Sequence, residues 1–525
     1  MTDSIFRRLP VGIQSFKVIR EENYLYVDKS DIVWNMVNLG DKYNYLSRPR
    51  RFGKSVLVDT LESYLEGRKD LFEGLKIMQL EKDWKQYPVI RLDMSRGGAN
   101  EDTLRSYLNL RFKDYEEKYN IIPDPTAMLA DRFHAIIATA YKQTGLRVAV
   151  LIDEYDSPLQ HSWRTPEHEK CTGVYREVFA ILKADDEYEH FIFITGITKF
   201  TQISLFSVLN NLSNISFMPE YATICGITEE EIKENFMPEL KQMSEANNWS
   251  VQETHDRLKA YYDGYHFSRR NMVDVYNPYS LVNALKSKEI INFWASSGAT
   301  SLLPKFIDNA ELRLSKFENC SVMRNTLELS DVSGGGAELF LYQSGYLTIK
   351  DSDEFGYILG FPNEEVKQAL YETVLPALAM RSESEILSLQ ACLYRYLGTG
   401  QIDEAMKSLK ALIADVPYSN KKLASMDMEE RYRLIISTIL NAIGLNVEVE
   451  KMISTGRIDM TVKTSRYIYV IELKLRNNGG KEAATEQILN RQYMEPFKAD
   501  KRKVIGLGIE LDEEGKGLLD WKRTE

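Results

Sequence analysis

Apolar residues in the N-terminal part of the chain gather in four short runs, and the stretches between them have helical spacing. The runs are "KYNYLS", "YPVIRLDMS", "RVAVLIDEYDSP" and "HFIFITGITKF". After the first run, "SVLVDTLESYLEG" places Leu57, Leu61 and Leu65 on one helical face, and Gly67 is a stop signal. Four buried strands separated by helices predict a parallel sheet that binds ligands at its carboxyl edge.

Near the C-terminus, "ISTGRIDMTVKTSRYIYVIELKL" has the pattern of two strands joined by a turn near Thr464-Ser465. A hairpin that closes there places position 459 opposite about 470, one step from 472. Glu472 and Lys474 are two residues apart on one strand, so their side chains point to the same face. We therefore expect Asp459, Glu472 and Lys474 to converge.

The region between these two patterns is predicted to be helical. "TEEEIKENFMPELKQM" opens with a capping box, Thr228 followed by Glu231, and "NPYSLVNALKS" and "GFPNEEVKQALYETVLPALAM" continue the helical pattern. His266, the last histidine of the chain, lies in "YDGYHFS". With no obvious chemical partner nearby, it indicates a packed aromatic turn rather than a catalytic site.

Composition limits the classes of protein that fit the chain. At 525 residues it is too long for one ordinary core, so we expect two to four domains of a globular protein. The start has no signal-peptide core and no apolar run is long enough to span a bilayer, so we expect no membrane contact and a cytoplasmic location. Four scattered cysteines fit a reducing cytosol. Because the net charge is −11, nucleic acid would need a local basic patch.

The segment "LSRPRRFGKS" ends like a phosphate-binding loop, G-x-x-x-x-G-K-[ST]. Gly53, Lys54 and Ser55 match that pattern, whereas Arg48 stands in the place of the first glycine. The strand predicted before the loop and the helix predicted after it give the required order, and a helix N-terminus offers N–H groups to phosphate. We expect Lys54 to reach the β- and γ-phosphates and Ser55 to ligate Mg²⁺.

A second motif follows further along, where an apolar strand ends in Asp153-Glu154. An acidic residue at that place can hold Mg²⁺, and a neighbouring glutamate can polarise the attacking water. The next strand carries Thr195 and Thr198 at its polar end, and such a residue could sense the γ-phosphate. The alternative is a buried strand followed by a solvated acidic turn, but two motifs in the required order favour a nucleotide site.

The C-terminal trio predicts a second kind of chemistry. Asp459 and Glu472 could hold Mg²⁺, which makes a water nucleophilic, and Lys474 could orient that water or stabilise the charge of the transition state. No histidine follows His266, so a metal site here is oxygen-rich, which favours Mg²⁺ or Mn²⁺ over zinc. An E-x-K pattern on a strand also occurs by chance as a solvated face.

Several segments together resemble the bacterial AAA-ATPase-like family, in which a C-terminal PD-(D/E)XK nuclease-like domain often follows. They are "LPVGIQSFKVIREENYLYVDKS", "SRPRRFGKS", "VLIDEYDSPL", "ITGITKFTQISLFSVLNNLSNIS", "YATICGITEEEI" and "YDGYHFS". The family's own loop has the RPRRFGKS form, so the resemblance implies an ATP site with Mg²⁺. The loop residues it implies for that site are Arg48, Pro49, Arg50, Arg51, Phe52, Gly53, Lys54 and Ser55. Arg48, Arg50 and Arg51 could contact phosphates or only hold the loop against acidic neighbours.

The resemblance also implies an α/β fold class and a division of the chain. We expect an N-terminal P-loop NTPase domain with a parallel, ASCE/AAA-like sheet over 1–225. A helical lid region over 226–345 and a helical connector over 346–420 should follow. The last part, 421–525, should be an α/β restriction-endonuclease-like domain.

Within that last domain, the resemblance implies particular site residues. The family's aspartate, E-x-K pair and glutamine–tyrosine helix match Asp459, Glu472, Lys474, Gln487 and Tyr493. The family also has an acidic residue on an upstream helix, for which "MEERYRLIISTIL" offers Glu429 or Glu430. One departure is Arg433, which follows the tyrosine of that helix where family members often have a histidine.

Two functions remain open at this point. The first is an ATP-regulated, metal-dependent nuclease that cuts DNA or RNA, with DNA favoured and defence or mobile-element processing as the candidate role. The second is a nucleotide-switched binding protein, in which ATP controls assembly, for example of a homo-oligomer. Contact with nucleic acid would rest on Arg457, Arg476, Arg491 and the stretch "KADKRKV" at 498–504, which could equally be ordinary surface residues.

Overall fold

The computed structural model describes residues 8–124, 126–198, 211–295, 317–328, 336–379, 383–414 and 427–525. The chain divides into two compact units. The first unit comprises Met1–Trp294 and Asn319–Asn363, and the second comprises Ala295–Glu318 and Glu364–Glu525. The finer division at 225, 345 and 420 stays a prediction. Across the described ranges, none of the helices combines the length and the apolar character needed to span a bilayer.

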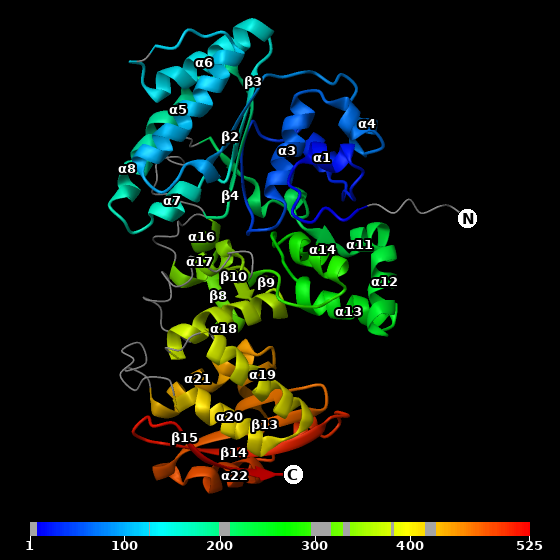
Figure 1. Cartoon of the computed structure of the whole chain (residues 1–525), viewed down its shortest axis with the longest axis vertical. Helices are drawn as coiled ribbons and strands as arrows, with labels where there is room; N and C mark the ends of the chain where they lie inside the picture. Colours follow the sequence, from blue (N-terminus) through cyan, green and yellow to red (C-terminus); the bar gives the residue numbers. More distant parts are fainter. Residues whose placement is uncertain are drawn as a thin grey trace, which may run out of the picture. The chain divides into compact units, whose positions relative to one another are not determined.

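The first unit is built on a parallel sheet with the strand order β2-β3-β4-β1-β5 (Figure 1). Its strands are β1 (Tyr43–Ser47), β2 (Val89–Asp93), β3 (Val148–Asp153), β4 (Glu189–Gly196) and β5 (Ser213–Asn214). The four predicted strands are therefore confirmed. β4 lies between the strand that leads into the loop and the strand that ends in Asp153. Because all the strands are parallel, their carboxyl ends meet at one edge.

Helices cover both faces of this sheet (Figure 1), which explains why its strands are apolar on both sides. On one face lie α5 (Glu101–Lys118), α6 (Leu129–Thr144) and α8 (Glu167–Phe179), joined to the sheet by the large buried cluster that includes Phe112, Phe133 and Ile152. On the other face lie α1 (Phe16–Glu21), α3 (Lys54–Leu65) and α4 (Ile77–Leu80). Further helices of this part are α2 (Ser30–Asn38), α7 (Ser157–Ser162) and α9 (Ile181–Ala184).

The rest of the first unit is mainly helical, as predicted, with two small sheets. The helices are α11 (Glu229–Asn235), α12 (Met237–Asn247), α13 (Val251–Tyr262), α14 (Pro278–Ser287), α16 (Arg324–Glu328) and α17 (Gly336–Ser344). The capping box of Thr228 and Glu231 is confirmed at the start of α11. The sheets pair β6 (Ile227–Thr228) with β7 (Val275–Tyr276), and β10 (Gly356–Gly360) with β8 (Cys320–Met323) and β9 (Thr348–Ser352).

The second unit begins with helices and ends in a mixed sheet of the order β11-β12-β13-β14-β15 (Figure 1). The helices are α18 (Glu364–Ala379), α19 (Glu383–Thr399), α20 (Ile402–Ala414), α21 (Met428–Ala442) and α22 (Gly480–Asn490). The strands are β11 (Asn446–Ile453), β12 (Gly456–Lys463), β13 (Tyr467–Leu475), β14 (Lys503–Leu511) and β15 (Leu518–Thr524). Only β13 and β14 are parallel among these neighbours, because α22 connects them as a crossover.

The hairpin of β12 and β13 forms, but its predicted register is wrong. Met460 pairs with Ile471 and Lys463 with Ile468, so the turn closes one residue later than expected. The hydroxyl of Thr464 stabilises this turn, because it accepts hydrogen bonds from the backbone N–H groups of Arg466 and Tyr467. Continuing the observed register by one step places Asp459 directly across from Glu472.

Candidate nucleotide-binding and metal-binding sites

The loop at residues 48–53 joins β1 to α3, so the predicted order of strand, loop and helix is confirmed. Gly53 is the residue before the helix and has a φ of +85°, a conformation that favours glycine. A Cβ built on Gly53 meets no atom within 4 Å, so open space lies beside the helix N-terminus. The first N–H groups of α3 have no partner within the helix and are suited to phosphate.

Lys54 is buried beneath this loop. Its Nζ donates to the carbonyl oxygens of Arg48 at 3.0 Å and Pro49 at 2.9 Å. An ammonium has three N–H donors, so one remains for a phosphate oxygen after these two bonds. Burial lowers the pKa of Lys54, while the acidic charges of Glu154 and Asp153 oppose that shift. The lysine therefore lies between the loop and the acidic end of β3.

Arg48 does not take the role of a phosphate ligand. Its side chain is only 1% exposed, and its Nη atoms donate to the carbonyls of Ser47, Ser216 and Tyr221 at 2.8–2.9 Å. The guanidinium also lies 4.1 Å from the ring centroid of Phe267. Arg48 was expected either to contact phosphate or to hold the loop, and because its donors serve backbone carbonyls we correct the phosphate contact to the second, structural role.

The neighbouring loop side chains also point toward the protein. The ring of Phe52 packs edge-on against Tyr265, with centroids 4.7 Å apart. The guanidinium of Arg51 lies 4.7 Å from the ring of Tyr279, and Arg50 donates to Gln160 at 3.3 Å. The Pro49 ring lies so close to Gly345 that a Cβ there would come within 2.6 Å. The loop can therefore offer a nucleotide its backbone and Lys54, with Arg50 and Arg51 held by other contacts.

The turn that carries His266 supports the loop from beneath. Tyr265 and Phe267 contact Phe52, and Phe267 also stacks on Arg48. His266 itself is occupied, because its Nε2 lies 2.9 Å from the carboxylate of Asp274 and its Nδ1 contacts the carbonyl of Ile349. The segment is a packed aromatic turn, as its sequence indicated.

The acidic end of β3 lies beside the start of α3. Ser55 lies near enough to Asp153 to act on the pKa of that carboxylate, lowering it against the larger effect of burial, so the two predicted Mg²⁺ ligands are together. Burial raises the pKa of both Asp153 and Glu154, and the charge of Lys54 acts against that rise. Glu154 follows with a φ of +48°, which few non-glycine residues adopt and which marks functional turns.

Sequence reasoning missed Asp93 at this edge. It ends β2 and is the register partner of Asp153 on the neighbouring strand. The signal was present in "VIRLD", an apolar run that ends in an acidic residue, as β3 does. The candidate site therefore has three acidic residues at the carboxyl edge, Asp93, Asp153 and Glu154.

Thr195 in β4 and Thr198 just after that strand both make hydrogen bonds inside the protein. Thr195 is fully buried and donates its hydroxyl to the carbonyl of Leu46 at 2.8 Å. Thr198 donates its hydroxyl and its backbone N–H to Asp156, each at 2.6 Å. A hydroxyl has one proton to donate, and both threonines donate theirs to an acceptor inside the protein. We therefore correct their expected role in sensing a γ-phosphate to a role in holding the end of β4.

The second unit brings the predicted carboxylates together. Asp459 on β12 accepts a hydrogen bond from the backbone N–H of Leu473 on β13 at 3.0 Å. Glu472 is 1% exposed, and its Oε1 lies 3.5 Å from Lys474 Nζ. Burial and the charge of Asp459 raise the pKa of Glu472 to about 8. Asp459, Glu472 and Lys474 therefore converge as expected.

Two further predicted residues reach the same place. Gln487 on α22 donates its amide to Glu472 and contacts the hydroxyl of Tyr493 at 3.3 Å. On α21, Glu429 accepts from the backbone N–H of Leu475 at 3.3 Å and from Asn478 at 3.2 Å. Of the two acidic residues offered by this helix, Glu429 is therefore the one at the end of β13, and these bonds give no such position to Glu430.

The residues at this site fit a divalent cation. The second oxygen of Glu472, Oε2, is buried and has no hydrogen-bond partner among the described residues. An unpaired buried carboxylate oxygen is costly, and a cation bound to it would remove that cost. Within the described ranges no three His, Cys, Asp or Glu side chains form a closed metal site. Remaining ligands would therefore come from water or a phosphate.

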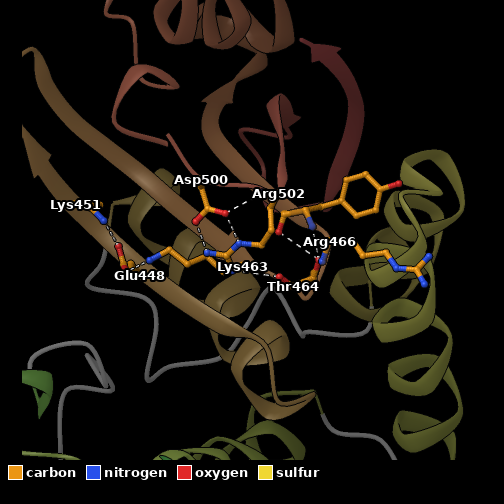
Figure 2. Close-up of polar contacts among 8 residues, drawn as sticks. Glu448, Lys451, Lys463, Thr464, Arg466, Asp500 and Arg502 are labelled. Atoms are coloured by element: carbon orange, nitrogen blue, oxygen red, sulfur yellow. Dashed lines mark hydrogen bonds and ion pairs between the residues drawn. The ribbon is translucent and has the colours of Figure 1, made fainter. Parts of the chain in front are cut away.

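Most of the basic residues expected to contact nucleic acid are paired. Arg457 lies 3.2 Å from Glu450, Arg476 2.9 Å from Glu510, and Arg491 donates to a backbone carbonyl at 3.4 Å. Figure 2 shows a second group at the turn of β12 and β13, where Arg502 binds Asp500 and Lys463 binds Glu448. This turn lies about 20 Å along β13 from Glu472, at about 3.3 Å per residue. A nucleic-acid surface there stays a prediction.

The two units thus define the class of the protein: a P-loop ATPase-like domain with a C-terminal α/β domain of the nuclease type. The family models agree. One described as "Predicted AAA-ATPase" matches residues 10–206, and one described as "PD-(D/E)XK nuclease superfamily" matches residues 427–521. The chain belongs to the family of AAA-ATPase-like proteins that carry a C-terminal PD-(D/E)XK domain. Part of the resembling sequence, 199–210, lies outside the described residues.

A curated relative matches from end to end. It is an uncharacterized protein in the vnfD 5′ region of Azotobacter chroococcum mcd 1, 31% identical over 532 residues and covering 98% of each chain. Two solved structures show weaker similarity. The Walker-type ATPase PABY2304 of Pyrococcus abyssi is 14% identical over 67% of this chain and 97% of its own, with a TM-score of 0.35. The ORC2 protein of Aeropyrum pernix is 11% identical over 82% and 91%, with a TM-score of 0.28.

Proposed function

We propose that the chain binds and hydrolyses ATP in its first unit and cuts nucleic acid in its second unit with the help of Mg²⁺ or Mn²⁺. DNA is the preferred substrate, and defence or mobile-element processing is the proposed context. The observation that carries the nuclease is the unpaired Oε2 of Glu472, buried beside Asp459 in a group that also holds Lys474 and Gln487.

At the nuclease site each residue has a separate task. A divalent cation held by Asp459 and Glu472 would activate a water and offset the charge that develops on the phosphate. The backbone N–H of Leu473 fixes Asp459, and the amide of Gln487 fixes Glu472. Lys474 adds a positive charge beside the reacting phosphate, which stabilises the transition state.

At the nucleotide site the backbone of the loop and Lys54 would hold the phosphates, and Ser55 with Asp153 would hold Mg²⁺. Glu154 is the candidate general base, because burial raises its pKa and keeps it ready to accept a proton from water. ATP turnover would then regulate the nuclease.

A cleavage assay tests this proposal directly. Single-stranded DNA, double-stranded DNA and RNA are incubated with Mg²⁺ or Mn²⁺, with and without ATP, and compared with the same reactions in EDTA. Metal-dependent cutting by the wild type that is lost in Glu472→Gln supports the proposal. Glu448→Gln, the same change in a carboxylate paired with Lys451 and Lys463 at the far end of the sheet, is the matched control.

One observation favours a second function, in which the nuclease fold only recognises nucleic acid and ATP switches that binding. Arg433 lies 2.8 Å from Asp459, so a positive charge already neutralises one of the proposed metal ligands. ATP-dependent binding of nucleic acid in a gel-shift assay, with no cutting of any substrate, would favour this switch over the nuclease.

A further inference from the structure

Arg433 links helix α21 to the carboxylates of the second unit. Its Nη1 lies 2.8 Å from Oδ1 of Asp459, and its Nη2 lies 3.2 Å from Oε1 of Glu450. The side chains of Arg433 and Asp459 are 15% and 13% exposed, so water screens this pair weakly. The other oxygen of Asp459 accepts the N–H of Leu473. Both oxygens of Asp459 are therefore engaged within the protein.

Each carboxyl group of the site has a basic side chain beside it. Arg433 faces Asp459, and Lys474 faces Glu472. A divalent cation placed between the two carboxylates would meet two positive charges within a few ångströms, where electrostatic repulsion is strong. Cation binding and the Arg433–Asp459 ion pair therefore compete for the same carboxylate.

Glu450 gives the guanidinium a second acceptor. The ladder of β11 and β12 pairs Val449 with Met460 and Lys451 with Ile458, and skips Glu450 between them. Glu450 has a φ of +53°, which non-glycine residues rarely adopt, at the position across from Asp459. Because Arg433 already contacts Glu450, it can release Asp459 without losing an acidic partner.

We propose that Arg433 is a positioning residue that closes the metal site. When it is paired with Asp459 it keeps that carboxylate from a divalent cation, and when it is paired with Glu450 alone it leaves Asp459 open. This inference rests on the proposed metal-dependent nuclease. If Arg433 closes the site, its removal strengthens metal binding. If Arg433 only supports the structure, its removal disorders Asp459 and weakens metal binding.

The affinity of the full chain for Mn²⁺, measured by calorimetry without nucleotide, tests this. Arg433→Gln removes the charge and should bind Mn²⁺ about tenfold more tightly than the wild type. Arg433→Lys keeps the charge and should stay close to the wild type. Arg457→Gln is the matched control, because Arg457 shares the partner Glu450 and does not contact Asp459.

A second pair of variants has the opposite expected sign. Glu450→Gln takes away the alternative acceptor, so Arg433 stays on Asp459 and Mn²⁺ should bind several-fold more weakly. Glu448→Gln makes the same charge change two residues earlier on β11, where the carboxylate pairs with Lys451 and Lys463, and should leave the affinity unchanged. If circular dichroism shows that Arg433→Gln does not fold, the comparison of Glu450→Gln with Glu448→Gln tests the role of Arg433 instead.

The outcomes separate the two proposals. Tighter Mn²⁺ binding in Arg433→Gln, with Arg457→Gln like the wild type, supports the closing role of Arg433. Equal or weaker binding in a folded Arg433→Gln overturns that role and leaves the nuclease standing. No binding of Mn²⁺ by the wild type and by every variant overturns the metal-dependent nuclease itself, and the role of Arg433 with it.

Discussion

The two candidate sites place arginine beside reactive groups in opposite ways. In the first unit, Arg48 is buried away from the helix N-terminus and serves three backbone carbonyls. In the second unit, Arg433 serves a carboxylate that is itself a proposed ligand. The loop offers a ligand mainly backbone, so its side chains are free to anchor the fold. The strands of the second unit use their backbone groups to pair with one another, so only side chains are left to bind a ligand. An arginine among these side chains, such as Arg433, therefore changes the charge of the site directly.

The largest effect should come from Lys54. Lys54→Ala removes the buried ammonium beneath the loop, and we expect ATP affinity to fall at least about 100-fold, because a charged hydrogen bond in a buried site contributes a few kcal/mol. Calorimetric titration with Mg²⁺–ATP measures this. Lys76→Ala, at an exposed position of the same unit, is the control. An unchanged affinity of Lys54→Ala for Mg²⁺–ATP would contradict the proposed nucleotide site.

Glu154 should separate binding from turnover at the same site. Glu154→Gln removes the candidate base and keeps Ser55 and Asp153, so ATP should bind normally while hydrolysis slows by about 100-fold or more. Phosphate release and nucleotide titration measure the two properties. Normal hydrolysis in this variant would show that another group activates the water.

In the second unit, replacing Glu472 by a neutral side chain should lower the rate of cleavage without lowering the melting temperature. Glu472→Gln should lose cleavage by about 100-fold or more. Its melting temperature in EDTA should stay equal or rise, because the amide no longer buries a charge beside Asp459. Cleavage that persists in Glu472→Gln would place the metal, if there is one, elsewhere.

Arg48 should matter for folding rather than for nucleotide contact. Arg48→Ala removes hydrogen bonds to three backbone carbonyls, two of them in buried surroundings, so we expect the free energy of unfolding to fall by about 3 kcal/mol. Arg50→Ala should cost less than about 1 kcal/mol, because its hydrogen bond to Gln160 is long and partly exposed. Urea unfolding of both variants compares them, and a mild Arg48→Ala with weak ATP binding would reverse our assignment.

The last prediction concerns how the free energy of unfolding depends on pH. The pKa of Glu472 is about 8 in the folded chain and about 4.5 in a free side chain, so the folded state holds more protons between these values. Its contribution to stability is therefore present in acid and declines as pH rises through this window, by at most about 1.4 kcal/mol per pH unit. Urea unfolding in EDTA at about pH 5.5 and about pH 8 should show a flatter dependence for Glu472→Gln.

Glu448→Gln is the control for that comparison. Hydrogen bonds from Lys451 and Lys463 lower the pKa of Glu448, although burial opposes them. A lowered pKa affects stability only in acid, below the unfolded value, so this variant should keep the slope of the wild type between about pH 5.5 and about pH 8. Equal slopes in Glu472→Gln and the wild type would contradict the raised pKa of Glu472.

The sequence predicted best what depends on residues close together in the chain. The strands of the first sheet, the loop and the start of α3 follow from apolar periodicity and from Gly53, whose φ is positive. The E-x-K pair needed only the two-residue repeat of a strand to place Glu472 and Lys474 on one face. Each of these inferences uses a geometric rule that acts over a few residues.

The errors lie where distant residues decide. Arg48 donates to Ser216 and Tyr221, which lie far from the loop along the chain. Nothing in "RPRRFGKS" therefore reveals that its guanidinium already has hydrogen-bond acceptors. The hairpin register is an exception, because the turn bonds of Thr464 to Arg466 and Tyr467 join residues close together in the chain. The ion pair of Arg433 with Asp459 joins a helix to a strand 26 residues later, and only the folded chain brings them together.

The support beneath the loop also sets the order in which the first unit can be built. β1 pairs with β4 and β5, and Arg48 bonds to Tyr221, 173 residues later. A ribosome delivers about 5–20 residues per second, so the loop emerges many seconds before its partners do. Until then, Phe52 and the guanidinium of Arg48 remain in water. A fragment that ends before Tyr221 would contain the whole phosphate-binding motif and lack part of what holds it, so the loop acquires its full support only after its signature has been made.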